Sequence, residues 1–255
     1  TGSPRNFMTA RIRRLFPGLF MMLVLLVFVM GPAVTAWAYH DYFKSSETWS
    51  YLLINASMLL TRYGLPGVFT NLPFPDVANG SLWTIRYEFY CYLALVILFL
   101  SGLLDRRRMP WVLPFAFAVT AVTAMIPPMD GFFGALLAQG PRLGLTFLCG
   151  AAAYLFRDRI RLSWGMLAGI FAIYVAVEAF ADARLIRPVL MTCFVLSFGL
   201  LTAKKKAVFA NIPDYSYGMY IYAFPVQQLL ITGLGPSNPY LIIGLSVAGT
   251  EPFPP

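Results

Sequence analysis

Charged residues are scarce in this sequence. Only 12% of its 255 residues are charged, whereas 59% are apolar. A water-soluble domain of this length carries about a quarter charged residues, which cover the surface that faces water. The shortage excludes an ordinary soluble globule and predicts a protein whose solvent is the hydrocarbon of a lipid bilayer.

Cysteines are few, and the usual signatures of metal and nucleotide sites are missing. The three cysteines, Cys91, Cys149 and Cys193, are scattered through apolar stretches, so we expect packing residues rather than disulfides. No CxxC pair, HExxH, GxSxG, phosphate-binding loop or dinucleotide fingerprint is present. We therefore expect no metal and no bound cofactor.

Long apolar runs fill most of the chain. A membrane-spanning helix needs about 20 apolar residues, and Leu19–Ala38 supplies such a run without a charge. We predict an all-α transmembrane bundle of about eight spans. The other seven are Leu82–Leu104, Trp111–Ile126, Gly134–Phe156, Trp164–Phe180, Pro188–Ala203, Tyr215–Leu234 and a short run at Tyr240–Gly249.

Basic residues gather in four short clusters between these runs, at 5–14, 106–108, 157–161 and 204–206. Two predicted spans separate each cluster from the next, so all four fall on one side, which the positive-inside rule makes cytoplasmic. We expect a multi-pass protein of a bacterial-type inner membrane with a cytoplasmic amino end. Clusters of this kind argue against nucleic-acid binding despite the net charge of +8.

The connection Tyr39–Ser81 is expected on the opposite, outer side. Its prolines and glycines favour a structured loop rather than a helix, although the apolar run Tyr51–Leu60 predicts a surface or re-entrant helix. The single histidine, His40, begins this connection beside Asp41. We expect it to be an interfacial residue rather than a catalyst.

A polar segment opens the second predicted span. Helical spacing places Ser81, Glu88 and Tyr92 on one face. A carboxylate within a span is costly unless it is paired or hydrated, so Glu88 is expected just below the outer surface, facing a cavity. Two interpretations remain open: a functional polar site, or a structural ion pair with one of the three candidate arginines, Arg62, Arg86 and Arg142.

Two further segments are also ambiguous. Arg11-Ile12-Arg13-Arg14 satisfies the positive-inside rule without any chemistry, but spaced arginines also bind phosphates, such as those of a coenzyme A thioester. Tyr217, Tyr220 and Phe224 are predicted to share one face of a late helix, with Tyr222 off it. Pro225 frees a backbone carbonyl of that helix, and the amides of Gln227 and Gln228 need partners at membrane depth.

These segments together resemble the acyltransferase 3 family. Residues 79–92 are similar to its S-L-W-[ST]-[LIV]-x-x-E-x-x-x-Y signature. Residues 11–17 resemble its R-x-x-R-[IL]-x-P entry to the third helix, and residues 216–222 its late S-Y-[GS]-[ILM]-Y-[IL] helix. The three occur in the family's order, and the resemblance covers essentially the whole chain.

The resemblance implies a membrane O-acyltransferase that moves an acetyl or other acyl group from acyl-CoA to a hydroxyl of a sugar or cell-surface glycan. It implies that Arg11 and Arg14 handle acyl-CoA and that Glu88 takes part in catalysis. As acceptor-site candidates it favours Trp83, Arg86, Tyr92, Tyr217 and Tyr220.

The family's proposed catalytic histidine lies on its first helix, and the family has about ten spans. No such histidine precedes the arginines here, so we expect residues 1–255 to be a single domain that lacks two amino-terminal helices, is cut at its carboxyl end and is inactive alone. The alternative is a transporter or flippase of a lipid-linked glycan, because polar residues at membrane depth suit that function too.

Overall fold

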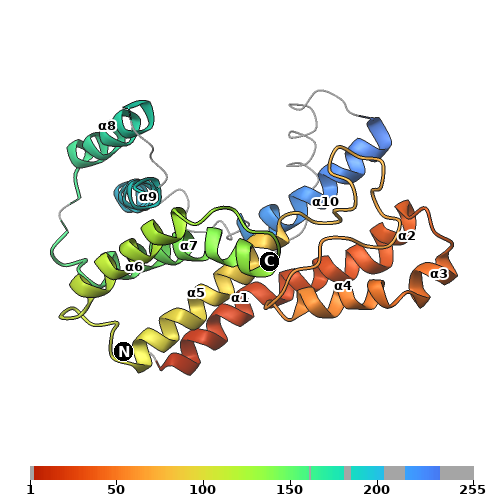
Figure 1. The fold of residues 1–255 in the computed structure, drawn as a ribbon, viewed down its shortest axis with the longest axis horizontal. Helices are drawn as coiled ribbons and strands as arrows, with labels where there is room; N and C mark the ends of the chain where they lie inside the picture. The colour runs from red at the N-terminus through yellow and green to blue at the C-terminus, as the bar shows by residue number, and fades with distance from the viewer. Residues whose placement is uncertain (1–2, 161, 181–184, 204–215, 236–255) are drawn as a thin grey trace. The chain divides into compact units, whose positions relative to one another are not determined.

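The computed structural model describes residues 3–160, 162–180, 185–203 and 216–235. Every regular element in these ranges is a helix, as the apolar runs predicted (Figure 1). The elements are α1 (Pro4–Leu25), η1 (Leu26–Met30), α2 (Gly31–Val34), α3 (Tyr39–Lys44), α4 (Ser46–Ala56), α5 (Leu82–Leu100), α6 (Met109–Ala124), α7 (Gly131–Leu155), α8 (Trp164–Phe180), α9 (Arg187–Ala203) and α10 (Ser216–Leu234).

The first helical stretch begins earlier than predicted. It runs without a break from Pro4 to Val34, so the arginines lie on the helix itself rather than before it. Proline suits the first turn because that turn has no partner for its N–H groups. Near the end, η1 forms a wide π turn, and the Tyr42 hydroxyl donates to the Val27 carbonyl in that turn over 3.1 Å.

The first part of the connection after this stretch is helical, which corrects the expectation of a loop there. It contains α3 and α4, and Ser45 caps α4 by accepting a hydrogen bond from the Glu47 amide at 3.2 Å. The predicted surface helix at Tyr51–Leu60 therefore begins earlier and ends at Ala56. Residues 57–81 contain no helix. Asn55 anchors their start, because its side chain bonds the carbonyl and the amide of Arg62 at 2.9 and 3.1 Å.

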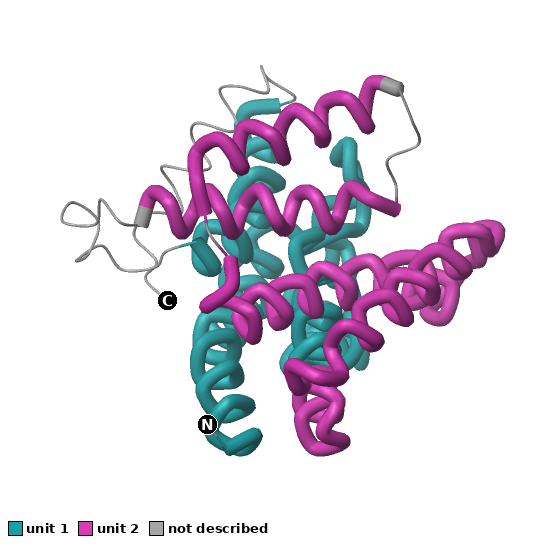
Figure 2. Tube along the Cα trace, turned by 90° about the vertical axis from the view of Figure 1, so that its left-hand side faces the viewer, with its two compact units in different colours: residues 1–92, 213–255 teal, residues 93–212 magenta. Residues whose placement is uncertain are grey.

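The chain forms two compact units, residues 1–92 with 213–255 and residues 93–212 (Figure 2). In the first unit, α1 packs against α4 and α10, and α3 packs against α4. In the second unit, α6 packs against α7, and α9 packs against both α7 and α8. The boundary between the units falls within α5, just after Tyr92.

Within the described residues, three helical stretches are long and apolar enough to cross a bilayer: Pro4–Val34, Leu82–Leu100 and Gly131–Leu155. Shorter apolar helices lie at Met109–Ala124, Trp164–Ala179 and Arg187–Thr202. The predicted run Tyr240–Gly249 lies outside the described residues. The helices thus match the predicted apolar runs in place, while only part of them reach full spanning length.

Candidate functional site

Helix α10 lies along α1 with two of its tyrosines turned toward the α1 backbone. The Tyr217 hydroxyl donates to the Leu15 carbonyl at 3.0 Å, and the Tyr222 hydroxyl approaches the Gly18 carbonyl at 3.5 Å. A Cβ at Gly18 would stand 3.0 Å from the Tyr217 ring, so glycine allows this close contact. Tyr217, Tyr220 and Phe224 were predicted to share one face of this helix, but their side chains do not meet the same neighbours. Tyr217 contacts α1, whereas the Tyr220 hydroxyl lies beside that of Thr84 on α5.

A buried amide joins α1, α10 and the start of α5. Asn79 is fully buried, and its side-chain nitrogen donates to the Ile221 carbonyl at 2.9 Å and lies 3.2 Å from the Met22 sulfur. Its side-chain oxygen accepts a hydrogen bond from the Ser81 amide at 2.9 Å. Ile221 stands four residues before Pro225, whose ring nitrogen has no hydrogen to donate. Asn79 thus satisfies the carbonyl that the proline leaves without a helical partner.

A cluster of charged and phenolic groups forms where α1 lies along α5. The Arg11 guanidinium lies 5.4 Å from the centre of the Tyr92 ring and 5.3 Å from that of Phe7, in cation–π geometry. The Tyr92 hydroxyl donates a hydrogen bond to the Glu88 carboxylate one turn earlier on α5. Arg14 follows Arg11 on the same side of α1, and Tyr217 reaches that helix at the Leu15 carbonyl, next to Arg14 in sequence.

These five residues, Arg11, Arg14, Glu88, Tyr92 and Tyr217, are called the arginine–carboxylate cluster below. Their convergence differs from the sequence-based placement, which put Glu88 near the outer surface and the arginines at the inner one. The difference arises because α1 begins at Pro4 and runs antiparallel to α5, which brings its third turn beside Tyr92.

Two of the three ion-pair partners proposed for Glu88, Arg62 and Arg86, have other contacts in this unit, and Arg142 belongs to the other unit. Arg62 pairs with Glu47 over 3.3 Å. Arg86 lies over the Tyr87 ring, with its guanidinium 4.8 Å from the ring centre, and donates to the Tyr87 hydroxyl at 3.0 Å. The Tyr87 ring in turn lies 6.0 Å from that of Trp83, in edge-to-face geometry, so Arg86 is linked through Tyr87 to another acceptor-site candidate.

An open cleft of about 530 Å³ lies beside the start of α5. Trp83 and Tyr220, both predicted acceptor-site residues, line it together with Tyr63, Phe74, Val77, Gly80, Ser81 and Phe224. We call this the aromatic cleft. Hydroxyls stand among its rings, since the Tyr220 and Thr84 hydroxyls lie 2.9 Å apart. Burial raises the pKa of Tyr63, so its hydroxyl stays neutral and able to donate at physiological pH.

Two features of the surrounding chain shape the aromatic cleft. The Gln228 amide donates to the carbonyls of Phe74 and Val77 at 3.0 and 3.1 Å, which fixes the loop wall against α10 and gives this buried amide its partners. At Gly80, a Cβ would stand 2.6 Å from the Phe224 ring. Glycine there lets the ring lie directly on the backbone.

His40 lies away from both arrangements. Its side chain is 71% exposed, and its Nδ1 atom is 3.4 Å from the Asp41 carboxylate. Neither residue lines the aromatic cleft. This is the environment of a surface residue, as predicted from its position at a helix end.

Sequence reasoning missed several residues of the site. Tyr63 and Phe74 lie in a loop without periodicity, and nothing local indicates that they meet α10. Asn79 was visible only as a neighbour of the signature residues. The available signal for Asn79 was Pro225, because a proline within a helix requires a donor from elsewhere for the carbonyl four residues before it.

The arrangement suits the binding of an anion beside a hydroxylated ligand. Arg11 and Arg14 supply planar donors that match phosphate oxygens. Aromatic faces with hydroxyls among them suit a ligand that has both apolar faces and polar edges. A carboxylate held by a phenol, as Glu88 is, can accept a proton or orient a donor.

Comparison with known proteins identifies the chain. A family model described as an acyltransferase domain matches residues 2–250. The chain is 27% identical over 238 residues to a protein of Shigella phage Sf6 named O-acetyl transferase, and the match covers 90% of this chain and 68% of that protein. No solved structure matches. The chain is therefore a membrane protein that transfers acyl groups other than aminoacyl groups, and it belongs to the acyltransferase 3 family.

Proposed function

We propose that this protein is an O-acyltransferase that moves an acetyl or other acyl group from acyl-CoA to a hydroxyl of a sugar or cell-surface glycan. The observation that carries the proposal is the convergence of Arg11, Glu88 and Tyr92 on one place. Such a site joins groups that bind an anionic donor to a group that handles a proton. The relative from phage Sf6, by its name, supports an acetyl group as the one transferred.

The donor side is the amino-terminal half of α1. The Arg11 guanidinium lies against the rings of Phe7 and Tyr92, which orients it before a ligand arrives. Arg14 follows three residues later, which places it on the same side of the helix. Together they can bind the phosphates of coenzyme A by paired, charge-assisted hydrogen bonds.

The acceptor side is the aromatic cleft. Trp83 and Tyr220 offer ring faces to the apolar side of a sugar, and the hydroxyls of Tyr63 and Tyr220 can bond its edges. Trp83 and Glu88 stand five residues apart on α5, which is about 7.5 Å along the helix axis at about 1.5 Å per residue. Trp83 is turned by about 140° from Glu88 around that axis, but Ser81, which also lines the cleft, shares the helix face of Glu88. An acceptor bound in the cleft can extend toward the carboxylate along this face.

Glu88 is the proposed proton-handling group. The acceptor oxygen attacks the thioester carbonyl carbon, a C–O bond forms and the C–S bond breaks. Glu88 takes the hydroxyl proton, and the departing thiolate of coenzyme A then receives it. Tyr92 donates to the same carboxylate and keeps it oriented during this transfer.

The membrane arrangement belongs to this proposal. We treat residues 1–255 as one membrane-embedded domain of about eight spans in an inner membrane, with the amino end cytoplasmic. A contact within residues 93–212 supports it: Arg106 Nη1 donates to Asp158 Oδ2 at 3.0 Å. This contact joins the loops that carry two of the basic clusters, which the proposal places on one side.

Radiolabelled acetyl-CoA tests the proposal in membranes from cells that express the whole gene, with transfer of label to glycan as the readout. Glu88→Gln keeps the shape of the side chain but removes the base. We expect kcat to fall by at least about a hundred-fold, since general acid–base catalysis contributes 10²–10⁴-fold. Tyr92→Phe is the matched control, because it leaves the carboxylate in place and should cost far less. Unchanged kcat in Glu88→Gln would refute the assignment.

The acceptor side has its own test. Trp83→Ala should raise KM for the glycan and leave KM for acetyl-CoA near its original value, because only the cleft loses a ring face. Trp111→Ala removes an exposed tryptophan elsewhere in the membrane-embedded chain and serves as the matched control. An equal rise in both KM values would assign Trp83 to general packing instead.

A further inference from the structure

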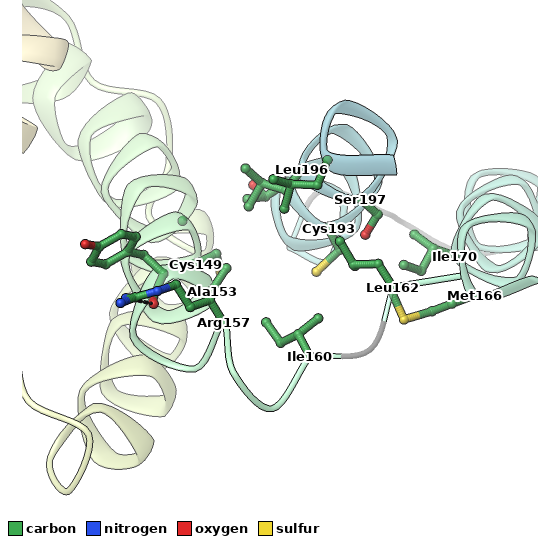
Figure 3. A pocket seen from close by; sticks show the side chains of 14 residues that line it. Cys149, Ala153, Arg157, Ile160, Leu162, Met166, Ile170, Cys193, Leu196 and Ser197 are labelled. Atoms are coloured by element: carbon green, nitrogen blue, oxygen red, sulfur yellow. Dashed lines mark hydrogen bonds between the residues drawn. The ribbon is translucent and has the colours of Figure 1, made fainter. Parts of the chain in front are cut away.

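A second cavity lies wholly within residues 93–212, apart from the residues discussed above. It has a volume of about 530 Å³ and is enclosed by α7, α8, α9 and the connection from α7 to α8. Figure 3 shows Cys149 and Ala153 of α7 opposite Cys193 and Leu196 of α9, with Ile160 on the connection. The volume falls in the range of small-molecule sites, which is about 300–1,000 Å³.

The wall of this cavity is apolar because of the residues that the three helices present. Small side chains stand where the helices face one another, among them Ala153, Ser197 and the glycine at position 150. A Cβ built on Gly150 meets no atom within 4 Å, so the cavity reaches the α7 backbone there. Met166 and Ile170 of α8 complete the wall. Such a lining binds hydrocarbon and offers few partners to a polar ligand.

One charged side chain interrupts the apolar wall. Arg157 lies two residues beyond the end of α7, with its guanidinium 4.4 Å from the centre of the Tyr154 ring. It donates to the Tyr154 carbonyl at 3.0 Å. Among the described residues no carboxylate pairs with it, because the nearby Asp158 bonds Arg106 instead. The guanidinium is exposed and keeps further N–H groups for an anion.

The apolar wall and the arginine at its end together match a ligand that has a hydrocarbon chain and an anionic group. An apolar cavity between helices takes an acyl chain, and an arginine at its end takes a phosphate. Basic pockets between membrane helices bind anionic phospholipid head groups in this way. We propose that residues 93–212 form a binding site for an anionic phospholipid, with one acyl chain in the α7–α8–α9 cavity and the phosphate on Arg157. The inference does not depend on the proposed function, since none of its residues belongs to the arginine–carboxylate cluster or the aromatic cleft.

Native mass spectrometry of the purified chain, released from bilayers of equal phosphatidylglycerol and phosphatidylcholine, tests the inference. We expect one phosphatidylglycerol to remain bound. Gly150→Leu should abolish its retention, because the new side chain enters open space within the cavity. Gly169→Leu is the matched control: Gly169 also has open space around it but does not line the cavity. Equal retention by Gly150→Leu and the unaltered chain overturns the proposal.

The head-group assignment is tested separately with Arg157→Gln. In this variant, the preference of the protein for phosphatidylglycerol over phosphatidylcholine should fall roughly five-fold, which is the contribution of one basic side chain near a membrane surface. Arg107→Gln, in another basic cluster, removes the same charge and should leave the preference unchanged. Equal losses in the two variants, or equal retention of both lipids by the unaltered chain, would contradict an anionic ligand at Arg157.

The two thiols in the wall give a readout that does not require lipid to survive purification. Cys149 and Cys193 line the cavity, whereas Cys91 is buried in the other unit. Phosphatidylglycerol should slow maleimide labelling of Cys149 and Cys193 but not that of Cys91. Protection by palmitoyl-CoA with none by phosphatidylglycerol would show that the cavity serves an acyl donor, and would overturn the lipid site.

Discussion

Replacing Asn79 with leucine isolates the buried junction between α5 and α10. Leucine has a similar volume but cannot donate to the Ile221 carbonyl, which Pro225 also leaves without a helical N–H. An unsatisfied buried acceptor costs about 1–3 kcal/mol. The Ser81 amide loses its acceptor as well, although it is only partly buried and water can replace that bond. We expect a loss of about 1–3 kcal/mol in the free energy of unfolding.

The proline supplies a control that few buried amides offer. Pro225→Ala restores an N–H at position 225, which can bond the Ile221 carbonyl within α10. In that background, Asn79→Leu should cost about 1–2 kcal/mol less than in the unaltered chain, because its main unsatisfied acceptor then has a partner. The interaction energy of this double-mutant cycle therefore measures the Asn79–Ile221 bond in isolation.

The assay is equilibrium unfolding in mixed micelles with rising sodium dodecyl sulfate, followed by far-ultraviolet circular dichroism. All four proteins of the cycle are compared under identical conditions. Additive effects of the two substitutions would show that Asn79 stabilises the fold by packing alone. That result would refute the argument that the amide compensates for the proline.

Two further perturbations follow from contacts at the surface and in the cluster. Arg11→Ala should weaken acetyl-CoA binding, measured by titration calorimetry in nanodiscs, by about ten- to a hundred-fold, since a charge-assisted hydrogen bond contributes about 1.5–3 kcal/mol. Arg13→Ala removes the same charge from an exposed position and should have a much smaller effect; equal losses would reduce Arg11 to a general electrostatic role. The hydrogen bond from Arg106 lowers the pKa of Asp158, so its stabilisation is present above the ordinary value of 3.8 and is lost as the pH falls through the lowered one. The difference in Tm between the unaltered chain and Asp158→Asn should therefore be constant at neutral pH, shrink below the ordinary value and vanish once the pH is below the lowered pKa. A difference that stays constant throughout this acid range would contradict the assignment.

The sequence predicted the helices well because the information for them is local. Apolar runs such as Trp164–Phe180 and Trp111–Ile126 coincide with α8 and α6 to within two residues. The start of α1 at Pro4 was missed, since charges ahead of an apolar run indicate an interface rather than a continuing helix. The hydrogen bonds of η1 leave no signal in composition, so the π turn was missed as well.

The sequence nominated candidate site residues but not the geometry that relates them. Arg11, Glu88, Trp83 and Tyr220 came from the resemblance, yet their division into a cluster and a cleft depends on how α1, α5 and α10 align. That alignment is set by contacts such as Tyr217 with Leu15, which are 202 residues apart in sequence. A pattern confined to one helix cannot report a register between two.

The π turn in the first helical stretch has a consequence for how this chain tolerates changes in length. A π turn holds one residue more than an α turn, and each residue advances a helix by about 100°. Removing one residue from Leu26–Met30 would therefore turn this stretch into a regular helix without rotating anything before it. Leu15, Gly18 and Met22 would keep their contacts with α10 and Asn79. The residues after the deletion would also face nearly the same direction, because the residue removed is the extra one that the π turn holds. The chain can thus gain or lose one residue at this turn while the helical residues on both sides of it stay in phase.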